Sequence, residues 1–188
     1  MSVSKVLPLC LVLLAASCGS PDPADLTATD LEGRAVQPFR ASQAKAVVLL
    51  FAAPDCPISN ALAPEVRRIA REYVPRGTDF YLVYAEETER EAIEQHIRDF
   101  EYTFPALLDF DHVLVDYTGA TVTPEAAVLT PGGELAYLGR INDLYVAFGK
   151  RRAEPTTAEL RDALEAVLTG EEPPVARTEA IGCFIPGA

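Results

Sequence analysis

The stretch of sequence that decides the fold is VVLLFAAPDCPISNALAP, residues 47–64. It opens with an apolar run at residues 47–52, and a run of this kind bounded by a Pro-containing turn is typical of a strand covered on both faces. Pro54 ends the run. From Ile58 onward, apolar residues recur at the spacing of a helix: Leu62, Val66 and Ile69. The stretch therefore predicts a buried strand, a short turn and a helix, with Cys56 at the turn.

Cys56 is the first candidate for a chemical role. A thiol at the start of a helix faces unpaired backbone N–H groups and the positive end of the helix dipole, which lower its pKa from the usual value of about 8.5. Asp55 opposes this effect if its charge lies close, because a carboxylate disfavours a neighbouring thiolate. We expect Cys56 to be an accessible, acidic thiol that acts as a nucleophile. The alternative is a buried structural cysteine.

Cys56 and its neighbours resemble the active-site stretch of thioredoxin. There, a redox Cys-x-x-Cys opens a helix that a proline kinks eight residues after the first Cys. Cys56 and Pro64 keep this spacing, while Ser59 stands in the place of the second Cys. The resemblance implies that Ser59 donates a hydrogen bond to the thiolate through its hydroxyl or backbone N–H, although a plain early-helix serine is the alternative. It also implies that Pro124, in Thr123-Pro124, follows a cis peptide bond and faces Cys56, leaving the preceding backbone open to an extended chain.

The remaining sequence alternates between strand and helix patterns. A hairpin is expected at residues 29–36, and strands and helices follow in turn: strands at 80–85, 106–109, 126–130 and 135–140, and helices at 88–100, 111–117 and 157–168. Thr88 with Glu91 forms a capping-box pattern, and Asp111 is the expected cap of the short helix. This order predicts an α/β, thioredoxin-like three-layer fold, with a central mixed sheet flanked by helices and an N-terminal hairpin. The chain resembles redoxins of the alkyl hydroperoxide reductase/thiol-antioxidant superfamily.

The N-terminus has the pattern of a secretory signal peptide. Lys5 precedes an apolar stretch at residues 6–16, and small residues lead to Cys18. The ending resembles the lipobox of bacterial lipoproteins, in which Cys18 is lipidated; ordinary cleavage that leaves Cys18 free is the alternative. We expect an exported protein, periplasmic or anchored to the outer membrane through the lipid alone. Its expected parts are a signal at 1–17, a tether at 18–28, a redoxin domain at 29–170 and a tail at 171–188.

Composition and charge exclude other classes of protein. The chain is 49% hydrophobic and 23% charged, which is typical of a globular protein. The net charge of −12 argues against a nucleic-acid partner, because phosphate binding needs clustered Lys and Arg. The basic run at residues 150–152 is short and is expected to be a solvated loop. The polar run at residues 140–143 is also expected to be a solvated loop, with a place beside the thiol site as its alternative.

The second candidate thiol is Cys183, in the C-terminal tail. Cys10 leaves with the signal and Cys18 is capped by lipid, so Cys56 and Cys183 remain in a compartment that permits disulfides. Cys183 could act as a resolving thiol if the tail brings the two Cα atoms within about 7 Å. A free buried thiol or an intermolecular bridge is the alternative.

A metal site is a different hypothesis for the same thiols. Cys56, His112 and Cys183 could bind copper or zinc. Sco-type copper chaperones are similar in fold and use two Cys and a His, but their CxxxC pair is absent because Asn60 stands at the second place. The other histidine, His96, is expected at a surface or boundary position.

The resemblance leaves two redox activities open. Typical peroxiredoxins carry Thr or Ser three residues before the peroxidatic Cys, and Pro four residues before that Thr or Ser. This chain has Ala53 at the first position and Leu49 at the second. The buried acid of thioredoxin is replaced by Leu50.

We expect thiol–disulfide exchange or peroxide reduction by Cys56, with Cys183 as possible resolving thiol. The expected partner is a protein thiol, a disulfide or a peroxide, and no organic cofactor is expected. The alternative to this redox function is a copper chaperone or a non-catalytic binding protein.

Overall fold

The computed structural model describes residues 22–40 and 43–188. The expected signal peptide, with Cys10 and Cys18, lies outside the described residues. Across the described ranges, no helix combines the length and apolar character needed to cross a membrane. Of the expected tether, residues 22–28 are described. They form a short 3-10 helix, Pro23–Asp25, and then enter the first strand.

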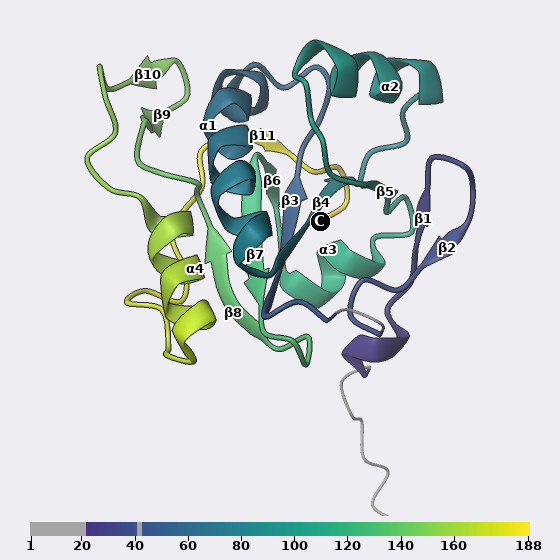
Figure 1. The fold of residues 1–188 in the computed structure, drawn as a ribbon. Helices are drawn as coiled ribbons and strands as arrows, with labels where there is room; N and C mark the ends of the chain where they lie inside the picture. The colour runs from purple at the N-terminus through teal and green to yellow at the C-terminus, as the bar shows by residue number, and fades with distance from the viewer. Residues whose placement is uncertain (1–21, 41–42) are drawn as a thin grey trace, which may run out of the picture.

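A seven-stranded sheet forms the middle of the molecule, in the order β2-β1-β5-β4-β3-β7-β8 (Figure 1). Strand β3 lies near the centre and pairs in parallel with β4 and antiparallel with β7, so the sheet is mixed as predicted. The predicted N-terminal hairpin is also confirmed, because β1 and β2 pair antiparallel. The strands are β1 Ala28–Asp30, β2 Ala35–Val36, β3 Ala46–Phe51, β4 Thr78–Tyr84, β5 Ala106–Leu108, β7 Glu125–Leu129 and β8 Leu135–Gly139.

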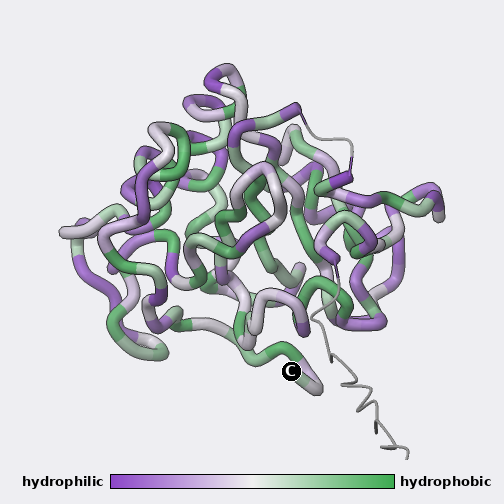
Figure 2. The backbone as a smooth tube through the Cα atoms, turned by 90° about the horizontal axis from the view of Figure 1, so that it is seen from below, coloured by the Kyte–Doolittle hydropathy of each residue, from purple (hydrophilic) through white to green (hydrophobic). Residues whose placement is uncertain are grey.

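Helices cover both faces of this sheet and complete the three predicted layers. Successive side chains of β3 point to opposite faces, so Val48 and Leu50 join one hydrophobic core with α1 and α4, whereas Val47 and Leu49 join a second core with α3. Figure 2 shows hydrophobic segments in the interior of the molecule and also just before the C-terminus. The helices are α1 Pro57–Tyr73, α2 Arg90–Asp99, α3 Val113–Thr118 and α4 Glu159–Thr169, with a short 3-10 helix at Val74–Arg76.

Two predicted helix caps are wrong. The Thr88 hydroxyl donates to the carbonyl of Glu86 at 3.0 Å, and α2 begins only after Glu89. At α3, Asp111 is exposed, and the buried carboxylate of Asp109 instead accepts hydrogen bonds from the first turn, at 3.0 Å from Leu114 N and 2.9 Å from Val115 N. Asp109 lies beneath the helix start, where its oxygens reach the unpaired N–H groups.

The C-terminal tail runs back over the domain. Next to β8, the backbone N–H of Leu138 donates to Ala176 O at 3.0 Å, and that of Thr178 donates to Leu138 O at 3.1 Å. The tail then forms strand β11, Cys183–Phe184, antiparallel to β6, Val122–Thr123. In Figure 1 the tail is the yellow segment that passes from α4 toward the middle of the molecule. This pairing brings Cys183 to the predicted thiol site.

Candidate thiol redox site

The structure places Cys56 where the sequence predicts it, between the end of β3 and the start of α1. Cys56 is the N-cap residue of α1, with extended backbone angles (φ −80°, ψ 107°), and Pro57 occupies the first helical position. Proline suits this position because its missing N–H would have no partner in the helix. The carbonyl of Cys56 accepts from Asn60 N at 3.0 Å, which begins the helical hydrogen bonding. Strand, turn and helix therefore fix the position of the sulfur.

The thiol of Cys56 is not accessible in this structure. Its exposed fraction is 0%, so the expectation of an accessible thiol is wrong. The reason is the tail, because β11 pairs with β6 and sets Cys183 opposite Thr123, the residue whose carbonyl contacts Cys56. Both cysteines are free thiols here.

The expectation of an acidic thiol agrees in direction with the surroundings of Cys56. Burial opposes ionisation of the thiol, but hydrogen bonds from the Cys183 side chain and from the backbone N–H of Ser59 outweigh this and lower the pKa of Cys56. The Thr123 side chain and the backbone N–H of Cys183 act in the same direction. Ser59 thus contributes its backbone at the helix start, where unpaired N–H groups gather.

Thr123 contacts the thiol of Cys56 from the opposite side of the site. The Thr123–Pro124 peptide bond is cis, as the thioredoxin resemblance implies. The carbonyl oxygen of Thr123 lies 2.9 Å from Cys56 Sγ and accepts its hydrogen. The Thr123 hydroxyl is buried and makes no hydrogen bond while the thiol is neutral, and its lowering of the pKa of Cys56 reflects donation to the thiolate. One residue therefore offers an acceptor to the thiol and a free donor to the thiolate.

Cys183 has the opposite tendency. Burial, the hydrogen bond to Cys56 and the charge on that residue raise the pKa of Cys183 to about 12, and the carboxylates of Asp55 and Glu86 add to the shift. A pocket of about 240 Å³ lies beside Cys183 and is lined in part by Asp55, Glu86 and Thr123. Cys183 therefore holds its proton more firmly than Cys56 does.

A polar network beneath α1 holds the Cys56 turn, and it contains His96. The exposed fraction of His96 is 3%, so its expected surface position is wrong. Its Nε2 lies 2.9 Å from Asn60 Oδ1, and its Nδ1 lies 2.6 Å from the Tyr84 hydroxyl. Asn60 Nδ2 donates to the carbonyl of Pro54 at 2.9 Å. Since Asn60 Oδ1 can only accept, His96 carries its proton on Nε2. Burial lowers the pKa of His96, so the ring is neutral.

The second histidine takes no part in the thiol site. His112 Nε2 lies 2.9 Å from the carbonyl oxygen of Ala85, to which it donates. In the parts of the chain that the structure describes, no group of three or more His, Cys, Asp or Glu side chains is placed to hold a metal ion. The alternative set of Cys56, His112 and Cys183 is therefore not assembled as a metal site by the described residues.

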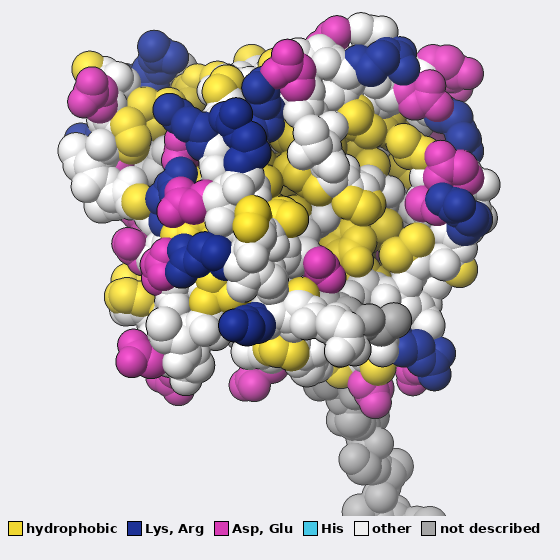
Figure 3. Space-filling view, viewed as in Figure 1, with side chains coloured by type: hydrophobic (Ala, Val, Ile, Leu, Met, Phe, Trp, Pro, Cys, Tyr) yellow, Lys and Arg dark blue, Asp and Glu magenta, His cyan; other side chains and the backbone are white. Residues whose placement is uncertain are grey.

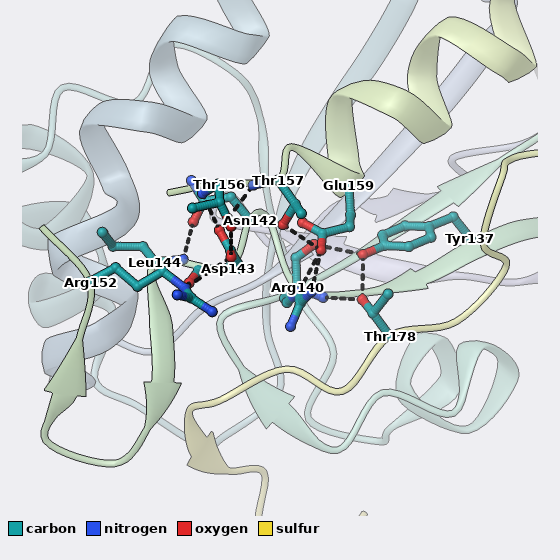
Figure 4. A network of polar contacts seen from close by, with 10 residues as sticks. All are labelled: Tyr137, Arg140, Asn142, Asp143, Leu144, Arg152, Thr156, Thr157, Glu159 and Thr178. Carbon is teal, nitrogen blue, oxygen red and sulfur yellow. Dashed lines mark hydrogen bonds and ion pairs between the residues drawn. The ribbon is translucent and has the colours of Figure 1, made fainter. Parts of the chain in front are cut away.

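The polar run at residues 140–143 forms a buried network instead of a solvated loop (Figure 4). Asp143 accepts from the backbone N–H of Thr156 at 2.6 Å and pairs with Arg152 at 2.9 Å. These contacts hold the pKa of Asp143 far below its usual range, the Thr156 hydroxyl contributing most. The network joins a hairpin missed by the sequence prediction, β9 Tyr145–Ala147 and β10 Lys150–Arg151, to the segment before α4. Its role is structural.

The same network also fastens the tail. The Tyr137 hydroxyl donates to Arg140 O at 2.7 Å and lies 2.7 Å from Thr178 Oγ1, and that oxygen accepts from Arg140 N at 3.1 Å (Figure 4). A side chain at Gly139 would place its Cβ 2.1 Å from Thr178 Oγ1, so glycine is required for this close approach. The tail is thus fixed at Thr178, and residues 179–188 continue from there to the thiol site.

Two larger pockets among the described residues carry no thiol. Pockets of about 420 Å³ and 550 Å³ lie at the start of β4 and beside β8, and neither is lined by a cysteine or a histidine. On the face shown in Figure 3, hydrophobic side chains gather between α1 and α2, and charged side chains of both signs surround them. The smaller pocket of about 240 Å³, by contrast, is lined in part by Cys183.

Comparisons with known proteins agree with this geometry. Residues 21–138 match the AhpC/TSA family. Similar solved structures include an uncharacterized conserved protein from Geobacillus kaustophilus, with 24% identity, 87% of this chain and 90% of the other covered, and a TM-score of 0.73.

Two further similar structures are described as a disulfide oxidoreductase and as a putative thioredoxin. A secreted Mycobacterium tuberculosis disulfide oxidoreductase, described as homologous to Escherichia coli DsbE, is 22% identical, with 80% and 99% of the chains covered and a TM-score of 0.54. A putative thioredoxin from Neisseria meningitidis is 20% identical, with 80% and 92% covered and a TM-score of 0.60. These likenesses show the thioredoxin-like fold. A comparison with curated proteins found no match.

Proposed function

The chain belongs to the AhpC/TSA family and is a thiol oxidoreductase with a thioredoxin-like fold, and we propose that it exchanges disulfides with a protein partner, using Cys56 as nucleophile and Cys183 as resolving thiol. The observation that carries this proposal is the register of β11 on β6, which sets Cys183 opposite Thr123, the residue whose carbonyl oxygen lies 2.9 Å from Cys56 Sγ. A donor at this place stabilises the thiolate of Cys56, which is the form that attacks. It also keeps the second sulfur within reach of the first.

The first step uses the Cys56 thiolate. It attacks one sulfur of the partner's disulfide and forms a mixed disulfide, while the partner's S–S bond breaks and the other partner sulfur leaves as a thiolate that takes a proton from water. Cys56 then bears no charge, so one cause of the raised pKa of Cys183 disappears. Resolution therefore becomes easier only after the partner is bound.

The second step uses Cys183. It loses its proton to water and attacks the sulfur of Cys56, so the mixed disulfide breaks and the partner's remaining sulfur leaves as a thiolate that takes a proton from water. Two electrons pass from the cysteine pair to the partner, and the protein ends with a Cys56–Cys183 disulfide. The reverse sequence oxidises a partner dithiol. Peroxide reduction is less well supported, because Ala53 offers no hydroxyl where typical peroxiredoxins carry one.

We also propose that the protein works outside the cytoplasm, as a lipoprotein anchored through Cys18. The signal-peptide pattern supports this location, as does the likeness to a protein described as secreted. Export matters for the chemistry, because a Cys56–Cys183 disulfide persists in an oxidising compartment. Metabolic labelling with a radioactive fatty acid tests the anchor: Cys18→Ser should abolish the label, and an unchanged label would contradict it.

The test of the redox proposal is the intact mass of the chain carrying Cys10→Ser and Cys18→Ser, before and after equilibration with dithiothreitol buffers. We expect a reversible loss of two hydrogens and a proteolytic fragment that links Cys56 to Cys183. Cys183→Ser should still form a mixed disulfide with a partner but should not release it. Cys56→Ser should do neither. Two thiols that stay free under every buffer would overturn the proposal.

A further inference from the structure

The tail strand β11 is held on β6 mainly through its backbone. Cys183 stands opposite Thr123 and Phe184 opposite Val122 in the antiparallel register, and Ile185 N continues the ladder by donating to Thr121 O at 2.9 Å. A ladder of this kind accepts any extended chain, and the side chains on alternate positions decide which chain fits. The side chains of β11 therefore indicate what this site selects.

The position before the cysteine has no room for a side chain. A Cβ built on Gly182 would lie 2.1 Å from the carbonyl oxygen of Thr123, 2.6 Å from its carbonyl carbon and 3.2 Å from Pro124 N. All three are backbone atoms beside the cis peptide bond, so they cannot turn away as a flexible side chain would. A segment that binds here must carry glycine before its cysteine.

The two positions after the cysteine differ from each other. Phe184 is 84% exposed, so the site makes little use of this side chain. Ile185 is only 5% exposed and packs in the second hydrophobic core. Alternation along the strand explains the difference, since residues two apart share a face. A segment that binds here gains from an aliphatic residue two places after its cysteine.

We propose that β11 occupies the binding site of the partner, and that the partner presents an extended segment of the pattern Gly-Cys-x-aliphatic, which displaces β11 and sets its own cysteine where Cys183 lies. This inference rests on the proposed disulfide exchange and names its substrate class. Cys56 then attacks the sulfur of that cysteine, and the partner's other sulfur leaves as a thiol. When the tail returns, Cys183 releases the partner and completes the two-electron transfer described above.

The experiment uses the full chain with Cys10→Ser, Cys18→Ser and Cys183→Ser, so that Cys56 is the only thiol. The probe is the peptide AIGCFIPG, the sequence of residues 180–187, with its cysteine activated as a thionitrobenzoate disulfide. Attack by Cys56 on the peptide sulfur releases coloured thionitrobenzoate. Three altered peptides carry Gly182→Val, Phe184→Ala or Ile185→Asp, and cystamine serves as a small disulfide without a backbone.

We expect the parent and Phe184→Ala peptides to react at similar rates, and the Gly182→Val and Ile185→Asp peptides to react about tenfold more slowly. Equal rates for all four peptides, with cystamine also reacting, would overturn the inference and leave the redox proposal standing. If neither cystamine nor any peptide reacts, Cys56 is not the nucleophile, and the proposed function falls with the inference.

A change within the protein provides a second measurement. Gly182→Val, added to the same chain, should expel β11 and raise the rate at which iodoacetamide alkylates Cys56 and the rate with the parent peptide. Phe184→Ala in the same strand is the matched control and should change neither rate, because its side chain faces solvent. Alkylation that Gly182→Val does not accelerate would show that β11 does not cover Cys56, which also overturns the inference.

Discussion

Thr123 contacts Cys56 with two groups of opposite character. Its carbonyl oxygen accepts the thiol hydrogen across 2.9 Å, whereas its buried hydroxyl has no hydrogen-bond partner. Once the thiol ionises, the carbonyl has nothing to accept and the hydroxyl can donate to the thiolate. An unpaired buried hydroxyl costs free energy, and the thiolate removes that cost. The site is therefore arranged for the ionised form of Cys56.

Replacing Thr123 by Val tests this arrangement. The variant keeps the shape and the carbonyl but removes the hydroxyl donor, so the pKa of Cys56 should rise, and alkylation at neutral pH should slow about tenfold. The free energy of unfolding should change by less than about 1 kcal/mol, since no hydrogen bond of the neutral thiol is lost. Stopped-flow alkylation and urea unfolding measure the two quantities.

Thr78→Val is the matched control, because the Thr78 hydroxyl is also buried without a partner but belongs to β4. It should leave alkylation of Cys56 unchanged. A Thr123→Val variant that alkylates as fast as the wild type would show that the hydroxyl does not support the thiolate.

The pH dependence of alkylation tests the role of Cys183. Only the thiolate reacts, and the pKa of Cys56 is lowered, so the rate should rise through a midpoint below the usual thiol value of about 8.5. Cys183→Ala removes a donor to the thiolate and should move the midpoint to higher pH. Cys183→Ser retains a hydroxyl donor and should move it less. Both variants lose the thiol of Cys183, but only Cys183→Ser keeps a hydrogen-bond donor at that position. Identical midpoints for the two variants would therefore contradict the donor role of Cys183.

Much of this site could be predicted from the sequence because its signals are local. The apolar run of β3, the proline spacing in α1 and the Thr123-Pro124 pair each fix nearby backbone. The pairing of β11 with β6 joins residues about sixty apart through two residues per strand, and such short strands have no periodicity to detect. The partnerless hydroxyl of Thr123 likewise depends on what surrounds it in space.

The burial of His96 did have a signal in the sequence. Ile93, His96, Ile97 and Phe100 follow helical spacing, which sets His96 on the apolar stripe of α2. The prediction of a surface or boundary position for His96 did not take this face into account. Its partners in space, Tyr84 and Asn60, then determine its tautomer, and no local pattern in the sequence encodes them.

We expect the burial of His96 to make the stability of the protein depend on pH. Burial lowers its pKa, so between about pH 6.5 and the lower folded value the unfolded chain binds more protons than the folded one. The free energy of unfolding should therefore fall as pH drops below about 6.5. His96→Gln removes the titrating ring and should flatten this part of the profile, measured by urea unfolding from pH 7.5 to 5.

The comparison of His96→Gln with the wild type isolates His96, because both proteins contain the buried acids Asp109 and Glu125. The raised pKa values of these acids oppose the loss of stability at low pH equally in the two proteins. If His96→Gln and the wild type lose stability in parallel, the ring does not titrate as its burial requires.

We expect the carboxylates of Asp55 and Glu86 to make the reaction at this site selective for charge. Both carboxylates line the pocket beside Cys183 and raise the pKa of that thiol. In the Cys183→Ser protein, cystamine, a dication, should therefore react with Cys56 faster than dithiodipropionate, a dianion, by about tenfold at low salt. The ratio should fall toward one at 1 M salt, where the screening length is only about 3 Å.

Asp55→Asn with Glu86→Gln should remove the preference. Glu171→Gln with Glu172→Gln, in a different pocket, should keep it. A preference that survives both high salt and neutralisation of the two carboxylates would have another origin.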